Sequence, residues 1–137
     1  MIETGLAGRS GWRFWPFAAA AWLFVACVVV QFFLVGLRVF DVKPWTELHA
    51  DFAYLYGWLT PVLVLLAAAS RAPARTQRLA LVLLVLFAIQ TFLPLLAADA
   101  PWLAALHAVN ALVVAWVAVR LALEASTKPD RSGTPSR

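Results

Sequence analysis

The chain has 137 residues, of which 64% are hydrophobic and 13% are charged, and its formal net charge is +4. A soluble domain carries about 25% charged residues, so this composition excludes an ordinary water-soluble domain and indicates a single membrane-embedded domain in contact with the lipid bilayer. The small positive charge is not that of a nucleic-acid-binding protein, and the single cysteine, Cys27, excludes an internal disulfide and a cysteine-based metal cluster.

Four apolar runs follow a polar, glycine-rich segment at residues 1–11, which we interpret as a tail. A helix needs about 20 apolar residues to span a bilayer. The runs predict membrane helices at 15–37, 48–69, 79–98 and 101–123, within a transmembrane domain at 12–123. The first run also has features of a cleaved signal peptide, but it is too long for the apolar part of one. Residues 124–137 are rich in Ser, Thr and Pro and predict a disordered cytoplasmic tail.

The connections between these runs are short, which makes consecutive helices antiparallel and favours a four-helix bundle. The expected fold is therefore an all-α, integral membrane four-helix bundle. Within the second helix, Thr60-Pro61 predicts a kink, because proline frees a carbonyl that a threonine hydroxyl can satisfy. Pro101 suits the first turn of the fourth helix. Residues 70–78 are predicted to form a short basic loop.

The basic residues indicate the orientation of the bundle. With both termini on one side, that side carries nine of them: Arg9, Arg13, Arg71, Arg75, Arg78, Arg120, Lys128, Arg131 and Arg137. The other side carries only Arg38 and Lys43. The positive-inside rule then predicts a multi-pass protein of the bacterial cytoplasmic (inner) membrane with both termini in the cytoplasm. The connections at 38–47 and 99–100 face outward.

Two stretches of the chain resemble each other. The first contains Gln31-Phe32-Phe33-Leu34, Pro44-Trp45 and Leu48-His49-Ala50, and the second contains Gln90-Thr91-Phe92-Leu93, Pro101-Trp102 and Leu106-His107-Ala108. The offset is 59 residues between the glutamines and 58 between the histidines. An internal repeat of this length predicts that the bundle is built from two repeated helical hairpins, related by a pseudo-two-fold axis along the membrane normal.

The repeat places the only two histidines of the chain, His49 and His107, at similar depth in the outer half of the bundle. Polar groups at membrane depth are costly and usually mark function. Two histidines related by a two-fold axis suit a flat metal cofactor with two axial positions, and imidazole is a common ligand of haem iron. We therefore predict that they are metal ligands to one haem b.

Further polar residues complete the predicted cofactor site: Gln31, Gln90, Asn110, Arg38 and Lys43. Each ligating imidazole needs a partner on its other nitrogen. Asn110 lies three residues after His107 on the same helical face and could supply one. The glutamines could bond backbone or propionate groups, and the two outer cations could pair with haem propionates. The predicted apolar walls are Phe33, Phe52, Phe87, Phe92 and Trp58.

Other interpretations stay open at this point. A histidine near a helix end can simply lie in the membrane interface, beside tryptophans that anchor the helix there. The duplication of Gln, Pro-Trp and Leu-His-Ala favours a shared site over that reading. The alternative is a cofactor-free membrane subunit or assembly factor with structural histidines, and a small transporter ranks third. Expected partners of a haem protein of this kind are a membrane redox partner or further copies of the chain.

At these residues the chain resembles one four-helix half of the haem A synthase family, over roughly residues 20–120. Histidines on the second and fourth helices of each half are axial haem ligands in that family, so the resemblance implies the same role for His49 and His107. The family also has a glutamate three residues before a catalytic histidine, where this chain has Thr46. The resemblance therefore implies haem binding more than synthase activity. The chain also resembles small uncharacterised bacterial four-helix membrane proteins with Leu-His-x-x-Asn in the fourth helix, here Leu106 to Asn110.

Overall fold

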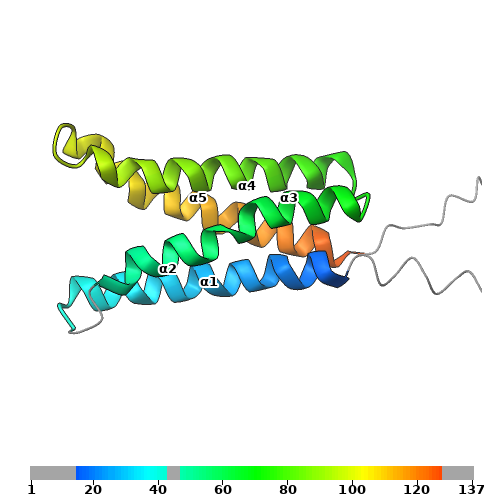
Figure 1. Cartoon of the computed structure of the whole chain (residues 1–137), viewed down its shortest axis with the longest axis horizontal. Helices are drawn as coiled ribbons and strands as arrows, with labels where there is room; N and C mark the ends of the chain where they lie inside the picture. The colour runs from blue at the N-terminus through cyan, green and yellow to red at the C-terminus, as the bar shows by residue number, and fades with distance from the viewer. Residues whose placement is uncertain (1–14, 43–46, 128–137) are drawn as a thin grey trace, which may run out of the picture.

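A computed structural model describes residues 15–42 and 47–127 of the chain. These residues form the helices α1 (Trp15–Val39), α2 (Leu48–Gly57), α3 (Leu59–Ala69), α4 (Ala74–Phe92) and α5 (Pro101–Ser126), and the short 3-10 helix η2 (Leu93–Leu96) (Figure 1). The described residues contain no strand. The predicted all-α class is confirmed.

Four helical segments are long and apolar enough to cross a membrane: Trp15–Val39, Leu48–Ala69, Ala74–Leu96 and Pro101–Ser126. The second of these joins α2 and α3, and the third joins α4 and η2. The structure thus agrees with the prediction of a four-helix membrane bundle. The predicted tails at 1–11 and beyond 127 lie outside the described residues.

Two helix boundaries differ from the prediction. The third span begins at Ala74 instead of 79, and the fourth runs to Ser126 instead of ending at 123. Polar contacts between the start of α4 and the end of α5 explain the additional helical residues. Thr76 Oγ1 donates to Glu124 Oε2 at 3.0 Å, and Arg75 Nε lies 3.1 Å from Glu124 Oε1. Residues 74–78 and 124–126, which were predicted to be loop and tail, are therefore helical because their side chains bond to one another.

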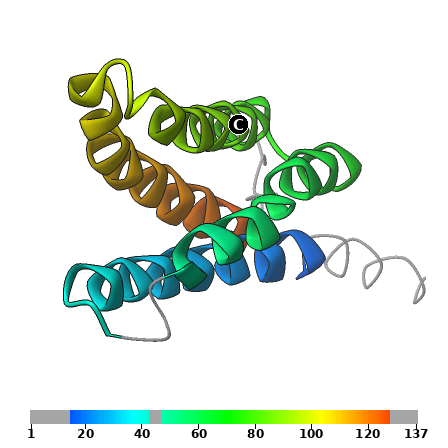
Figure 2. The same cartoon turned by 60° about the vertical axis from the view of Figure 1, so that its left-hand side comes forward.

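The spans follow one another around the bundle. α1 packs against α2, α3 and α5, while α4 packs against α3 and α5. The second and fourth spans therefore face each other diagonally across the bundle axis. At one end of the molecule, the end of α1 and the start of α2 diverge from the end of α4 and the start of α5 (Figures 1 and 2).

The core is packed at the opposite end only. The largest fully buried side chains are Phe17, Phe24, Leu63, Leu83, Leu121 and Thr60. Phe24, Tyr56 and Phe87 form a triangle of edge-on rings, with centroids 5.3 to 5.9 Å apart. Beyond this triangle, none of the residues 35–42, 47–55 and 88–113 is buried. The bundle is closed at the end that holds the start of α1 and the end of α5, and open at the other.

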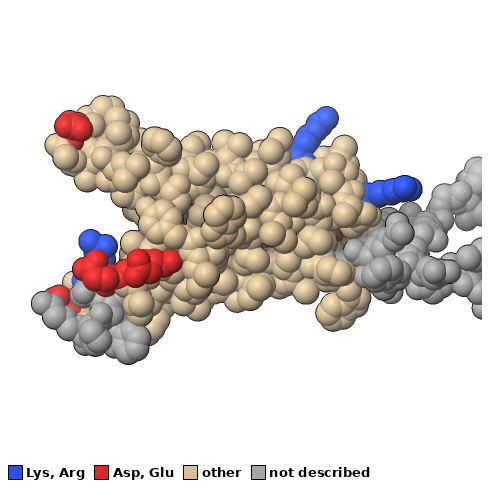
Figure 3. All heavy atoms as spheres, viewed as in Figure 1, with Lys and Arg blue, Asp and Glu red and all other residues tan. Residues whose placement is uncertain are grey.

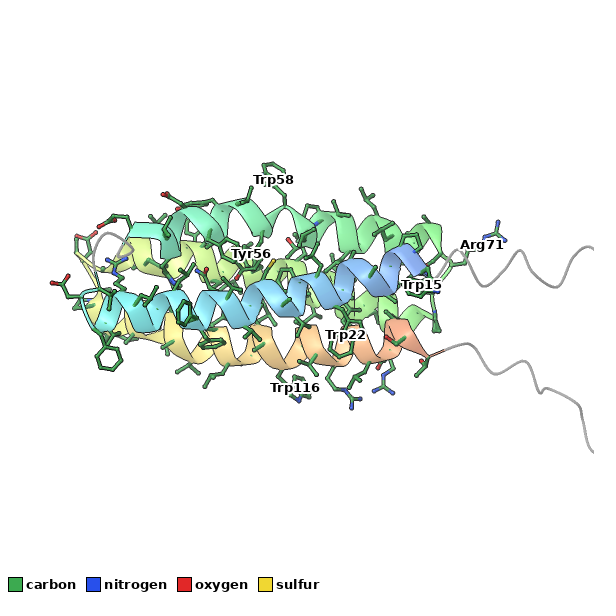
Figure 4. The ribbon with its side chains drawn as sticks, turned by 90° about the horizontal axis from the view of Figure 1, so that it is seen from below. Trp15, Trp22, Tyr56, Trp58, Arg71 and Trp116 are labelled. Atoms are coloured by element: carbon green, nitrogen blue, oxygen red, sulfur yellow. The ribbon has the colours of Figure 1, made fainter. Side chains whose placement is uncertain are left out.

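The second span is interrupted at Trp58, between α2 and α3. Pro61 has no N–H group, so it leaves the carbonyl of Gly57, four residues earlier, without its helical donor. The Thr60 hydroxyl donates to this carbonyl at 2.9 Å. The predicted kink and its threonine compensation are both present, and the break lies one turn before the proline. Figure 4 shows Trp58 pointing away from the bundle and Tyr56 pointing into it.

Two helices end in turns that use a left-handed residue other than glycine. Asp41 has φ 50° after α1, and Arg71 has φ 54° after α3. In the first turn the N–H groups of Asp41 and Val42 donate to carbonyls of the last turn of α1 at 3.1 and 2.9 Å. This is the Schellman arrangement, in which a left-handed residue satisfies the last carbonyls of a helix.

Candidate functional site

A cavity of about 460 Å³ lies at the open end of the bundle. It is lined by residues of all four spans, among them Val28, Gln31, His49, Tyr56, Gln90 and His107. The space-filling view shows this end hollowed between the two diverging parts of the molecule (Figure 3). Most of the lining is apolar, and the polar groups converge at the histidines. Ligand sites commonly combine these two properties.

The two histidines come from diagonal spans and meet across the bundle. His49 lies in the first turn of α2 and His107 in the second turn of α5, and both are half-buried. Their ring centroids are 6.2 Å apart, with ring planes at 73°. Two imidazoles on opposite sides of one metal ion have bonds of about 2 Å and about 1.1 Å from nitrogen to ring centre, which separates their centres by about 6 Å. The two rings lie at about this separation in an edge-to-face contact, with each Nε2 next to the amide nitrogen of its own glutamine.

His107 is held by Gln90 through both ring nitrogens. His107 Nδ1 lies 2.9 Å from the backbone carbonyl oxygen of Gln90, and His107 Nε2 lies 3.1 Å from Gln90 Nε2. A carbonyl accepts only, so Nδ1 carries the proton and Nε2 presents its lone pair to the amide. This tautomer is the one that metal-ligating histidines adopt when their second nitrogen is bonded to a backbone carbonyl.

His49 is held more loosely by Gln31. The amide nitrogen of Gln31 donates to the backbone carbonyl of His49 at 2.7 Å, and it lies 3.4 Å from His49 Nε2. His49 Nδ1 and Gln31 Oε1 are buried and have no hydrogen-bond partner among the described residues. Buried polar atoms usually have partners, and an unpaired one costs stability. These atoms therefore mark a place where a further group would be favourable.

Asn110 contacts the glutamine and not the histidine. Its Nδ2 donates to Gln90 Oε1 at 2.6 Å and to the backbone carbonyl of Leu86 at 3.0 Å. Asn110 therefore acts on His107 through Gln90. The direct partner of His107 Nδ1 is the backbone carbonyl of Gln90, and not Asn110 as the sequence suggested.

The other predicted site residues are placed unequally. Arg38 is exposed and lines the cavity, whereas Lys43 lies outside the described residues. Of the predicted apolar walls, Phe87 lines the cavity. Phe33, Phe92 and Trp58 are instead 65%, 69% and 76% exposed, on faces that would contact lipid. Sequence reasoning missed Tyr56, which the spacing from His49 through Ala53 to Tyr56 along one helical face could have identified.

Charge is distributed unequally between the two ends. Among the described residues, the open end carries Arg38 together with the acidic residues Asp41, Glu47, Asp51 and Asp99. The closed end carries Arg71, Arg75, Arg78, Arg120 and Glu124. Figure 3 shows the acidic side chains at the hollowed end and basic side chains toward the other. Within the described part of the chain, Arg38 is thus the one cation at the open end, where the acidic side chains outnumber it.

The donor set itself restricts the kind of metal site. The described residues contain no group of three or more His, Cys, Asp or Glu side chains that could hold a metal ion. Two histidines alone leave the remaining coordination positions of an ion unfilled.

Comparisons with curated proteins and with solved structures each found no match. A comparison with protein families found one. The matched part runs from the middle of α1 to just beyond η2, so that it contains Gln31, His49 and Gln90 and ends before α5. Residues 31–98 of this chain are similar to the Family of unknown function (DUF6220).

Proposed function

We propose that this chain is a small membrane protein that binds one b-type haem through His49 and His107 near the outer face, for electron transfer or haem handling. The observation that carries the proposal is the 6.2 Å separation of the two histidine rings across the bundle. Two rings from diagonal helices would meet in this way if both histidines held one metal ion.

The cavity supports this proposal in size and chemistry. Its volume of about 460 Å³ lies within the range of roughly 300–1,000 Å³ of ligand sites. Its apolar lining suits a porphyrin, and His49 Nδ1 and Gln31 Oε1 are buried without partners among the described residues. When bound, the haem would supply a redox-active iron with four in-plane nitrogens.

The residues of the chain would orient and tune this group. The bond from His107 Nδ1 to the Gln90 carbonyl fixes the tautomer and makes Nε2 a stronger ligand. Nε2 would exchange its contact with the Gln90 amide for the metal. Arg38 beside the cavity would pair with a propionate.

The orientation and the repeat belong to the same proposal. Nine basic residues on one side against two on the other favour a bacterial inner-membrane protein with cytoplasmic termini by the positive-inside rule, and the cavity would then open outward. The two Gln–His pairs, with Nε2 to Nε2 distances of 3.4 and 3.1 Å, are consistent with two related hairpins.

A cofactor-free membrane subunit or assembly factor is the second candidate. One observation favours it: His107 already has both ring nitrogens bonded within the chain, so it can serve as a structural link between α4 and α5. In that case the histidines would stabilise the bundle and bind nothing.

Absorption spectra of detergent-purified protein made with ample haem separate the two candidates. We expect a Soret band and a low-spin, six-coordinate oxidised spectrum in the wild type. His49→Ala and His107→Ala should each abolish the six-coordinate spectrum, because the chain has no third histidine to substitute. Gln77→Ala, at the closed end, is the matched control and should leave the spectrum unchanged. A wild type without a Soret band, or His→Ala variants with wild-type spectra, would favour the cofactor-free candidate.

A further inference from the structure

The two Gln–His pairs of the cavity are chemically alike but unequally satisfied. In the second pair, both nitrogens of His107 are bonded to Gln90, and Gln90 Oε1 accepts from Asn110 at 2.6 Å. In the first pair, His49 Nδ1 and Gln31 Oε1 are buried and unpaired within the described chain. The ring of His107 is therefore held closely at both nitrogens, whereas the ring of His49 has weaker contacts with Gln31: its Nε2 lies 3.4 Å from the Gln31 amide nitrogen, whose bond of 2.7 Å goes to the His49 backbone carbonyl.

One side chain accounts for the difference between the two glutamine oxygens. Asn110 stands three residues after His107, and the same position after His49 is occupied by Phe52. Phenylalanine has no N–H group to offer Gln31 Oε1, and the Phe52 ring packs instead against Tyr56 with centroids 5.2 Å apart. The donor that completes the second pair is thus replaced in the first pair by an apolar ring.

The backbone adds to the inequality. His107 lies on α5, a continuous helix of 26 residues that packs against α1, α4 and η2. His49 lies on α2, a helix of 10 residues that ends at the break before Trp58 and packs chiefly against α1. A short helix beside a break moves more readily than a turn within a long, packed helix.

We infer that the two axial positions are unequal: His107 is the permanent ligand, and His49 is an exchangeable one that a small neutral ligand of the carbon monoxide class replaces. This inference rests on the haem proposal above. Ligands whose second nitrogen is bonded hold a metal more tightly than ligands without that support. The exchange breaks the bond from His49 Nε2 to iron and forms one to the small ligand, with no transfer of electrons or protons.

Haem affinity of the two histidine variants tests the inequality. Loss of outer-shell support alone typically costs about 10–100-fold in metal affinity, so we expect His107→Ala to weaken haem binding by more than about 100-fold. His49→Ala should weaken it by less than about 10-fold and leave a five-coordinate spectrum. Reduced wild type should bind carbon monoxide slowly, and reduced His49→Ala should bind it at once.

A reciprocal pair of substitutions provides the matched control. Phe52→Asn gives the first pair the donor that it lacks. The reduced Phe52→Asn variant should therefore bind carbon monoxide more slowly than the reduced wild type. Asn110→Leu removes the donor from the second pair, and should bring the haem affinities of the His49→Ala and His107→Ala backgrounds closer together. Neither substitution removes an iron ligand.

A measurement on haem-free wild type tests the same inequality without any substitution. In ¹⁵N spectra of the two histidines, His107 should show one fixed tautomer, protonated at Nδ1, and His49 should show a mixture. The inference would be overturned if both histidines showed the same ¹⁵N signature. It would also be overturned if the wild type binds haem and the two His→Ala variants lose equal haem affinity. Either result would leave the haem proposal intact. A wild type that binds no haem would overturn both.

Discussion

At the scale of single residues, His49 and His107 illustrate what a sequence can and cannot specify about a membrane site. Their matched positions in two similar stretches of sequence predict that they lie together, and their rings are 6.2 Å apart. The partners of their second nitrogens were not predictable. The partner of His107 is the backbone carbonyl of Gln90, a group that every residue possesses and that only the helix geometry brings into reach.

The position of Gly57 leads to a prediction about packing. A Cβ atom at Gly57 would lie 2.6 Å from Phe87 Cε1, whereas one at Gly36 would meet nothing within 4 Å. Overpacking costs typically about 1–3 kcal/mol, so Gly57→Ala should lower the free energy of unfolding by that amount. Gly36→Ala, in an open helical position, should be neutral or stabilise by up to about 1 kcal/mol. SDS titration of the detergent-solubilised protein measures both; equal effects would mean that the Gly57–Phe87 contact does not limit packing.

At the scale of elements, the lengths of the apolar runs predicted the four spans well. Polar residues near the helix ends caused two boundaries to be predicted wrongly. The spans at 15–39 and 48–69 agree with the predicted 15–37 and 48–69 within the usual uncertainty of helix ends. The start of α4 and the end of α5 were missed because Arg75, Thr76 and Glu124 read as loop and tail residues. Their helical state depends on contact between segments far apart in the chain, which no local pattern encodes.

The break between α2 and α3 gives an element-scale prediction. Thr60→Val removes the hydroxyl that bonds to the Gly57 carbonyl, and should destabilise the protein by about 0.5–2 kcal/mol. Pro61→Ala restores a backbone donor to that carbonyl, so Thr60→Val should cost much less in the Pro61→Ala background. A double-mutant cycle on the same SDS titration measures the coupling. Additive effects of the two substitutions would show that the hydroxyl does not compensate for the proline.

At the scale of the whole molecule, the bundle combines a tightly packed end with a hollow one. The prediction of an all-α four-helix bundle required only apolar lengths and short connections, and it is confirmed. The polar residues of the hollow end predicted a site there, but the divergence of the helices that hollows it was not predictable from the sequence. Whether an apolar side chain faces the core, the cavity or lipid depends on how the helices diverge, as the exposed Phe33 and Phe92 show.

The charge distribution gives a prediction for the whole molecule. Reporter fusions after Arg137 and after Arg75 should read as cytoplasmic, and one after Lys43 should read as external, because the basic residues gather on one side of the bundle. Replacing Arg71, Arg75 and Arg78 together by Ala should reduce this bias. An external carboxyl terminus in the wild type would place the cavity on the cytoplasmic side and contradict the proposed orientation.

The one-ended core also sets the order in which backbone amides exchange with deuterium. Local opening occurs where few apolar contacts hold the backbone, so amides in 47–55 and 88–113 should exchange faster than those in 59–87 and 114–126. A compound that fills the cavity would slow the first group and leave the second unchanged. Deuterium uptake measured with and without haem therefore reports occupancy of the cavity segment by segment, in protein that stays folded in both states.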